Sequence, residues 1–270
     1  QLSCKTIKID WPVRIKAGIA KTKIPVSKNI IQLAQEEGLP GGVVHQIYQD
    51  PKGIYWIATG KGLCRYDGEY FELFTFISKE PQGNVQVVQM KEDRLGRLWI
   101  LTQTNGIYVF DYSSGIVKNI LNTTYDITVD SKGNVWMVSF PEIVSMVNPE
   151  TLMAQNISSR LLSDSGIVAR VINGDNNQML FRTGEGVAIL DLPKKKISQW
   201  HIKPEKDYSS IYYFFKTNAG NIMIATHDGI DMVKPDSSIL LHFSKDQSIE
   251  AAPLRYSVAE DSKGRIWQAK

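Results

Sequence analysis

Few side chains in this sequence have the types and spacing that acid–base or metal chemistry needs. The histidines are His45, His201, His227 and His242, and no two have the spacing of a metal-binding helix or loop. His227-Asp228 has the side chains of an acid–base pair, but similar segments carry the small polar turns GKG, QTNG and GEG at this place. Nucleophile-elbow, P-loop and dinucleotide motifs are absent. The sequence therefore predicts no catalytic residue, no metal site, no cofactor and no enzyme activity.

The two cysteines, Cys4 and Cys64, are too few for a disulfide framework. Cys64 lies in a strand-like segment and is predicted to be a small buried residue. The letters LSC at residues 2–4 are similar to the cleavage site of a bacterial lipoprotein, although Gln1 stands where an aliphatic residue is usual. The sequence leaves open whether Cys4 is a lipidation site.

The charges of the chain nearly balance, with 31 Lys and Arg against 28 Asp and Glu. A net charge of +3 spread over the sequence does not favour binding to nucleic acid or to an anionic membrane surface. No window reaches the roughly 18 apolar residues that a membrane helix needs. We therefore expect a soluble globular protein, linked to a membrane only through parts of a longer parent protein.

One pattern recurs along the chain: Asp, two residues, Gly, two residues, Trp, two residues and Thr. Four copies contain its first three residues, at Asp50, Gly53, Trp56, Asp93, Gly96, Trp99, Asp130, Gly133, Trp136, Asp261, Gly264 and Trp267. Two weaker copies begin at Gly174 and Thr217 and have Leu180 and Met223 at the tryptophan position, which we call the anchor. Successive anchors are 37 to 44 residues apart. A period of this length predicts a repeat architecture.

Each unit reads as four short strands separated by tight turns, the plan of a β-propeller blade. Asp and Gly suit a tight turn between the first and second strands, and Asn177 replaces the glycine in the fourth copy because Asn also tolerates positive φ. The large apolar anchor is predicted to fill the space between neighbouring blades. The repeat is therefore interpreted as the framework of the fold.

The expected domain is a single all-β propeller over residues 1–270, with about six anchors. Residues 38–254 form five full blades, residues 255–270 begin the last blade, and residues 1–37 supply its closing strands, predicted at 18–22 and 29–35. Closure by both ends would remove exposed sheet edges. The alternative is a truncated seven-bladed propeller.

Residues 38–70, from GLPGGVV to RYDGEY, carry the closest resemblance to a known family. The stretch resembles the two-component regulator propeller repeat, which builds the periplasmic sensing region of hybrid two-component histidine kinases in Bacteroides-type bacteria. The resemblance implies a periplasmic sensor module that binds an oligosaccharide or other small ligand. It also implies a kinase outside this chain, and signalling through a homodimer or a change in subunit arrangement. Residues 140–235 depart most from the family pattern.

A ligand is expected where two sets of propeller loops gather on one face: those between second and third strands, and those leading into the next blade. Planar hydrogen-bonding groups and an aromatic platform would suit a sugar. The candidate ligand-binding residues on these loops are Lys61, Gln103, Asn105, Glu185, His227, Asp228, Arg255 and Tyr256.

Two alternatives remain beside the sensor, because one fold supports many functions. A propeller could act as a scaffold that binds segments of other proteins. It could also be a propeller-type lyase, with His227 and Glu185 as the residues whose replacement would abolish activity.

Overall fold

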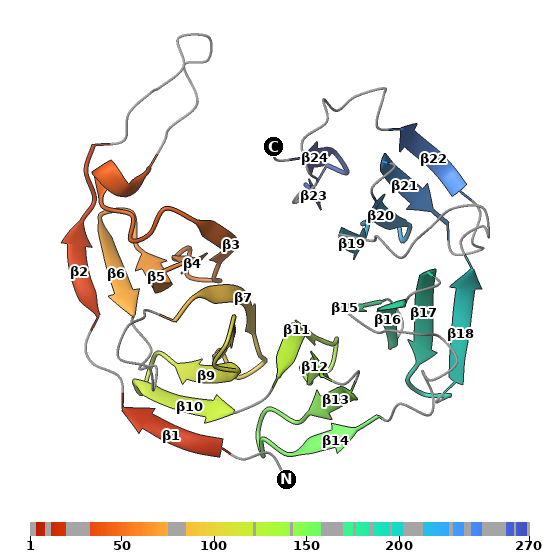
Figure 1. Cartoon of the computed structure of the whole chain (residues 1–270), viewed down its shortest axis with the longest axis horizontal. Helices are drawn as coiled ribbons and strands as arrows, with labels where there is room; N and C mark the ends of the chain where they lie inside the picture. Colours follow the sequence, from red (N-terminus) through yellow and green to blue (C-terminus); the bar gives the residue numbers. More distant parts are fainter. Residues whose placement is uncertain are drawn as a thin grey trace. The chain divides into compact units, whose positions relative to one another are not determined.

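The structure is a computed structural model of the chain. It describes residues 4–8, 12–19, 33–74, 85–120, 123–140, 143–157, 170–174, 177–183, 186–194, 196–201, 213–226, 229–234, 239–244, 258–261 and 263–268. These residues form antiparallel β-sheets, and their one helix is the short 3-10 turn η1 (Gln35–Glu37). The all-β prediction is confirmed (Figure 1).

The chain folds as two compact units, residues 1–127 with 147–154 and residues 128–146 with 155–270. The first unit holds two five-stranded sheets. One has the order β2-β6-β5-β4-β3, with β2 (Val13–Lys16), β3 (Val44–Gln49), β4 (Tyr55–Thr59), β5 (Gly62–Tyr66) and β6 (Tyr70–Phe74). The other has the order β1-β10-β9-β8-β7, with β1 (Cys4–Lys8), β7 (Val87–Glu92), β8 (Leu98–Thr102), β9 (Ile107–Asp111) and β10 (Ile116–Ile120).

The third sheet, β11 (Thr124–Val129), β12 (Val135–Ser139), β13 (Ile143–Val147) and β14 (Ala154–Asn156), is crossed by the boundary between the units. The second unit continues with β15 (Arg170–Asn173), β16 (Gln178–Thr183), β17 (Gly186–Asp191) and β18 (Lys196–His201). The next sheet contains β19 (Tyr213–Lys216), β20 (Ile222–Thr226), β21 (Gly229–Val233) and β22 (Ile239–Ser244). A two-stranded sheet of β23 (Val258–Glu260) and β24 (Ile266–Gln268) follows. All six anchors lie on the second strand of their sheet, as predicted.

The N-terminal segment adds outer strands to the first two sheets. β1 pairs with β10, and β2 pairs with β6, so each of these sheets gains a fifth strand. Most of the closing strands predicted at 18–22 and 29–35 lie outside the described residues. The described parts of the two segments, 18–19 and 33–35, are not in strands. Closure of a ring by these segments therefore stays a prediction.

The repeated aspartate organises the turn between the first and second strands. Asp50 Oδ1 accepts hydrogen bonds from the backbone N–H groups of Lys52 and Ile54, at 2.9 and 3.0 Å. Its other oxygen accepts the indole N–H of Trp56 at 3.1 Å. Gly53 has a φ of +83°, which only glycine adopts without strain. One carboxylate thus fixes the turn and the anchor ring together.

The same bonds recur in the next two copies. Trp99 donates to Asp93 Oδ2 at 2.8 Å, and Trp136 donates to Asp130 Oδ2 at 2.9 Å. Both indole rings are fully buried, so their N–H groups need this acceptor.

Where the aspartate is lost, the tryptophan is lost as well. Gly174 and Thr217 stand at the aspartate position, and their anchors, Leu180 and Met223, have no N–H to satisfy. The hydroxyl of Thr217 still accepts the backbone N–H of Asn221 at 3.0 Å. Asn177 has a φ of +62°, as predicted for the residue that replaces glycine. The two weaker copies therefore retain the turn but lack both the indole and the aspartate that accepts its N–H.

The anchors fill the space between successive sheets, as expected. The Trp56 ring lies 6.1 Å from the ring of Phe110 and 5.5 Å from that of Tyr112, both contributed by the next sheet. Trp136 packs edge-on against Phe181 of β16 with centroids 6.3 Å apart. Burial of these rings supplies much of the hydrophobic stabilisation at each junction.

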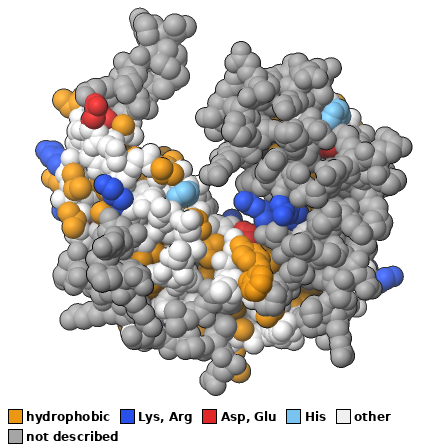
Figure 2. All heavy atoms as spheres, in the orientation of Figure 1, with side chains coloured by type: hydrophobic (Ala, Val, Ile, Leu, Met, Phe, Trp, Pro, Cys, Tyr) orange, Lys and Arg blue, Asp and Glu red, His pale blue; other side chains and the backbone are white. Residues whose placement is uncertain are grey.

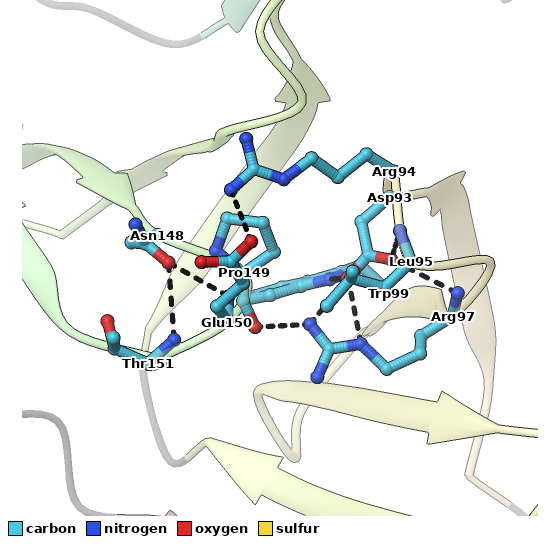
Figure 3. A network of polar contacts seen from close by, with 9 residues as sticks. All are labelled: Asp93, Arg94, Leu95, Arg97, Trp99, Asn148, Pro149, Glu150 and Thr151. Atoms are coloured by element: carbon cyan, nitrogen blue, oxygen red, sulfur yellow. Dashed lines mark hydrogen bonds and ion pairs between the residues drawn. The ribbon is translucent and has the colours of Figure 1, made fainter.

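Asp93 lies at the centre of a larger polar network (Figure 3). Its fully buried carboxylate pairs with Arg97, whose Nη2 is 2.7 Å from Oδ2. Arg97 also donates to the carbonyl of Pro149 in the β13–β14 turn, and Arg94 reaches Glu150 of that turn at 3.0 Å. Removing these donors would lower stability, because the charge of the buried carboxylate would be left without its hydrogen-bond partners.

We expect Asp93→Asn to lower the free energy of unfolding by about 3 kcal/mol, because Asn removes the charge that Arg97 faces and cannot accept all the same bonds. Urea unfolding followed by fluorescence measures this change. The matched control is Glu150→Gln, which breaks an exposed ion pair of the same network and should cost less than about 1 kcal/mol. Equal effects of the two variants would contradict the central role of Asp93.

Cys64 is a buried free thiol on β5, as the sequence predicted. Burial raises its pKa to about 12, with the nearby Glu72 carboxylate acting in the same direction and a backbone hydrogen bond opposing it. The reactive thiolate is therefore scarce at neutral pH.

In a Cys4→Ser variant, we expect a thiol reagent such as DTNB to leave the native protein unlabelled at pH 8. One thiol per chain should react after unfolding in guanidinium. Rapid labelling of the native variant would show that Cys64 is accessible.

Candidate functional site

The turns between second and third strands are closed by the threonine of the repeat. Thr59 Oγ1 donates to the carbonyl of Gly62 at 2.9 Å and accepts the backbone N–H of Lys61 at 3.1 Å. Thr102 does the same in the second sheet, donating to Gly106 at 2.7 Å and accepting from Asn105 at 3.1 Å. Both threonines are buried, so these turns are held rigidly at the end of their sheets.

The segment leading into the first strand lies against the same turn. The backbone N–H of Gly60 donates to the carbonyl of Val43 at 3.0 Å. In the second sheet, the backbone N–H of Gln103 donates to the carbonyl of Gln86 at the same distance. Gly41 also lies against this turn: a Cβ atom built on it would be 3.3 Å from Thr59 Oγ1 and 3.4 Å from Lys61 Cγ. For the first two sheets, the two predicted sets of loops therefore meet at one rim.

Two of the predicted ligand-binding residues stand free at this rim. Lys61 and Gln103 are exposed, and the segment beside the Lys61 turn carries exposed Val43 (57% exposed) and Val44. His45, at the start of β3, is also exposed. An ammonium, an amide and apolar surface together suit a polar organic ligand with both hydroxyl groups and hydrophobic faces.

The hydrogen bonds of Asn105 stabilise the turn in which it lies. Its side-chain oxygen accepts from the Thr104 hydroxyl at 2.8 Å, and its carbonyl accepts from the Asn119 amide at 3.1 Å. It also bonds the hydroxyl of Tyr108, an interaction that opposes the rise in the Tyr108 pKa caused by burial. The structure thus gives Asn105 a positioning role that the sequence did not predict.

The other predicted ligand-binding residues lie outside the described residues; they are Glu185, His227, Asp228, Arg255 and Tyr256. The strand pairs that flank three of them are described: Thr183 pairs with Gly186, and Thr226 pairs with Gly229. Within the described part of the chain, no group of three or more His, Cys, Asp or Glu side chains could hold a metal ion.

Two glutamines that the sequence reading missed join neighbouring sheets of the first unit. Gln46 accepts the backbone N–H of Met90 at 2.7 Å and donates to the carbonyl of the same residue at 3.2 Å. Gln89 binds Ile127 in the same way, at 3.1 and 3.0 Å. Each side-chain amide therefore pairs with the next first strand as a backbone peptide would.

The glutamines occupy one repeat position, ten residues before the anchor. Strand pairing is shifted just before each of them, between Val44 and Gln46 and between Val87 and Gln89. Such a bulge re-aims the following side chain. The recurrence of Gln at one position was the signal in the sequence, but its partners lie about 40 residues away.

Residues 38–61 match a family model described as two component regulator propeller. The chain carries a two-component regulator propeller repeat. The matched stretch contains the segment leading into β3, the strands β3 and β4, and Lys61 of the following turn, so it includes the first sheet's part of the rim. No relative was found among curated proteins.

Solved structures show the same fold at low sequence identity. The extracellular domain of the putative hybrid two-component system BT3049 from B. thetaiotaomicron is 20% identical, with a TM-score of 0.65 over 84% of this chain and 32% of that one. The extracellular domain of the putative hybrid two-component system BT4673 is 18% identical, with a TM-score of 0.66 over 86% and 34%. This chain thus spans about a third of the length of those sensor domains.

An enzyme has a similar fold. A catalytically inactive virginiamycin B lyase from Staphylococcus aureus, solved with quinupristin, is 14% identical, with a TM-score of 0.64 over 83% of this chain and 76% of that one. Together these matches show that this chain has a β-propeller fold, built from antiparallel sheets of which most have four or five strands. The described residues include no helix of the length and hydropathy needed to cross a bilayer.

We expect Gln89→Ala to lower the free energy of unfolding by about 1 to 3 kcal/mol, because it leaves the backbone groups of fully buried Ile127 without their partners. Chemical denaturation measures the change. Gln103→Ala, which removes an exposed amide from the rim, should leave stability within about 0.5 kcal/mol. A neutral Gln89→Ala variant would show that the amide bridge does not hold the sheets together.

Proposed function

We propose that this chain is the ligand-sensing propeller of an extracytoplasmic two-component sensor, located in the periplasm. Its ligand is an oligosaccharide, and occupancy is passed on through a homodimer to a kinase elsewhere in the parent protein. The observation that carries this proposal is the regulator propeller match at 38–61, because the matched residues build the first sheet's part of the rim, with exposed Lys61. The likeness to extracellular domains of Bacteroides sensors supports the same function.

The rim suits recognition of a sugar. Its turns are fixed by buried threonines and backbone bonds, so little entropy is lost when a ligand binds. Lys61 and Gln103 supply hydrogen-bonding groups directed to solvent. In Figure 2, the described surface over the first two sheets mixes isolated basic and histidine side chains with hydrophobic ones. Such a surface favours a ligand with hydroxyl groups and apolar ring faces.

We expect one member of a panel of plant, host and microbial oligosaccharides to raise the thermal unfolding midpoint by about 5 °C at a hundredfold excess over its Kd, because it binds only the native state. Differential scanning fluorimetry detects the shift. The double variant Lys61→Ala, Gln103→Ala should lose most of it. Lys52→Ala, which removes an exposed lysine from the β3–β4 turn at the other end of the first sheet, is the control. Cooperative unfolding with no shift by any saccharide would contradict the proposal.

Lyase activity is the second candidate, because the virginiamycin B lyase is covered over 76% of its own length. A sensor should not convert quinupristin, whereas a lyase of that kind should. We expect the chromatographic retention of quinupristin to remain unchanged after prolonged incubation with the protein and a divalent metal ion. Conversion that is lost in His227→Ala or Glu185→Gln would favour the enzyme over the sensor.

A further inference from the structure

The fourth repeat carries two arginines directly opposite each other. β15 pairs with β16 in a register that places Arg170 against Arg182. Residues opposite each other in an antiparallel pair share one face of the sheet, with Cβ atoms about 4.5 to 5.5 Å apart. Both arginines are partly buried. The pair therefore concentrates two positive charges at one place in the second unit.

The position of the pair follows from the residues beside it. Ile172 and Leu180, two residues further along the same face, belong to the apolar cluster that joins this sheet to Phe214 of β19. Arg170 and Arg182 therefore continue this face beyond the cluster, toward the β16–β17 turn.

This end of the sheet corresponds to the rim of the first two sheets. Thr183 and Gly186 flank the β16–β17 turn as Thr59 and Gly62 flank the turn of Lys61. The arginine pair thus lies next to a turn of the kind that forms the candidate ligand-binding face.

Both arginines differ from the residues at the same positions of the first two repeats. The position two residues after the anchor is buried and apolar in four other repeats, where it is occupied by Ala58, Leu101, Val138 and Ala225. Arg182 alone places a charge there among these five. The fold does not require this arginine.

Arg170 also replaces a residue with a structural role. It stands ten residues before its anchor, where Gln46 and Gln89 both accept and donate a bond to the next sheet. A guanidinium has no acceptor, so Arg170 cannot form that two-way bridge. The fourth repeat therefore has a positive charge at the position where the first two repeats have a bridging amide.

Like charges directly opposite each other on a sheet are destabilising, and an oxyanion between them reverses the sign of that interaction. Each arginine already interacts with other groups of the structure, but a guanidinium carries five donors in a planar fork that suits carboxylate and sulfate groups. We propose that Arg170 and Arg182 form an oxyanion subsite at the β16–β17 end of their own sheet in the second unit, so that the ligand bound there is an acidic oligosaccharide. This proposal rests on the proposed sensor function.

Isothermal titration with an oligogalacturonide, a sulfated chondroitin disaccharide and a neutral galacto-oligosaccharide tests the subsite. The first two probes distinguish carboxylate from sulfate. We expect one acidic probe to bind at least tenfold more tightly than the neutral one, with an affinity that falls as salt rises. Arg170→Gln and Arg182→Ala restore the residues of other repeats, and each should weaken acidic binding roughly tenfold to a hundredfold. Lys194→Gln, which removes an exposed charge from the β17–β18 turn of the same sheet, is the matched control.

Thermal unfolding without ligand separates a binding role from a structural one. Both arginine variants should remain folded and unfold cooperatively, and the loss of the interactions that each arginine makes within the structure should shift the midpoint without accounting for the loss of affinity of the folded protein. Arg182→Lys keeps the charge, and it should retain folding but lose part of the affinity because the planar fork is lost.

Several results would overturn the subsite. If the neutral probe binds wild type and both variants equally well, the sensor function stands and the subsite is wrong. Binding of no saccharide at all overturns both proposals. An equal response to sodium sulfate alone would mean an adventitious ion only, and destabilisation by both variants with acidic binding unchanged would mean a purely structural role.

Discussion

The bond between a buried carboxylate and an indole is the interaction on which this fold depends. Asp50, Asp93 and Asp130 each use one oxygen to fix a turn and the other to satisfy a buried tryptophan N–H. The large ring can then fill the junction between sheets without leaving a polar group unpaired. Arg97 adds a second donor to Asp93, and its bond to Pro149 ties that turn to the β13–β14 turn. The repeat is therefore a polar unit as much as a hydrophobic one.

A second constraint comes from the first strand of each repeat, such as β3 and β7, which lies at one edge of its sheet. The backbone groups along that edge have no partner within the same sheet. Gln46 and Gln89 meet this constraint by presenting a side-chain amide to the backbone of the next first strand. Their position at a bulge lets the amide leave the plane of its sheet. Neighbouring sheets are thus joined by apolar packing at the anchors and by hydrogen bonds along the first strands.

These constraints also show where the chain is free to specialise. Positions that accept the indole or bridge the sheets are fixed by packing and hydrogen bonding, whereas Lys61 and Gln103 lie on turns that buried threonines already hold. The fourth repeat goes further, because it gives up both the Asp–Trp bond and the glutamine bridge and carries Arg170 and Arg182 instead. A repeat that departs from the first two repeats at these four positions is where a recognition function is most easily built.

The sequence by itself determined the four-strand pattern of the five full repeats and the place of each anchor. The repeat period, the turn residues and the strand patterns are local features of the sequence, so they can be recognised without knowing how the strands pack. It also placed Lys61 and Gln103 correctly on exposed turns. Only the tertiary structure decided what the turns are tied to: the entry segment against Gly60, the amide bridges of Gln46 and Gln89, and the outer strands β1 and β2, which the sequence had not assigned to the first two sheets. The two members of each of these contacts lie roughly 17 to 110 residues apart in the sequence, and no local pattern predicts a contact across that separation. The opposition of Arg170 and Arg182 belongs to the same class, since a register is set by the pairing of whole strands rather than by either arginine alone.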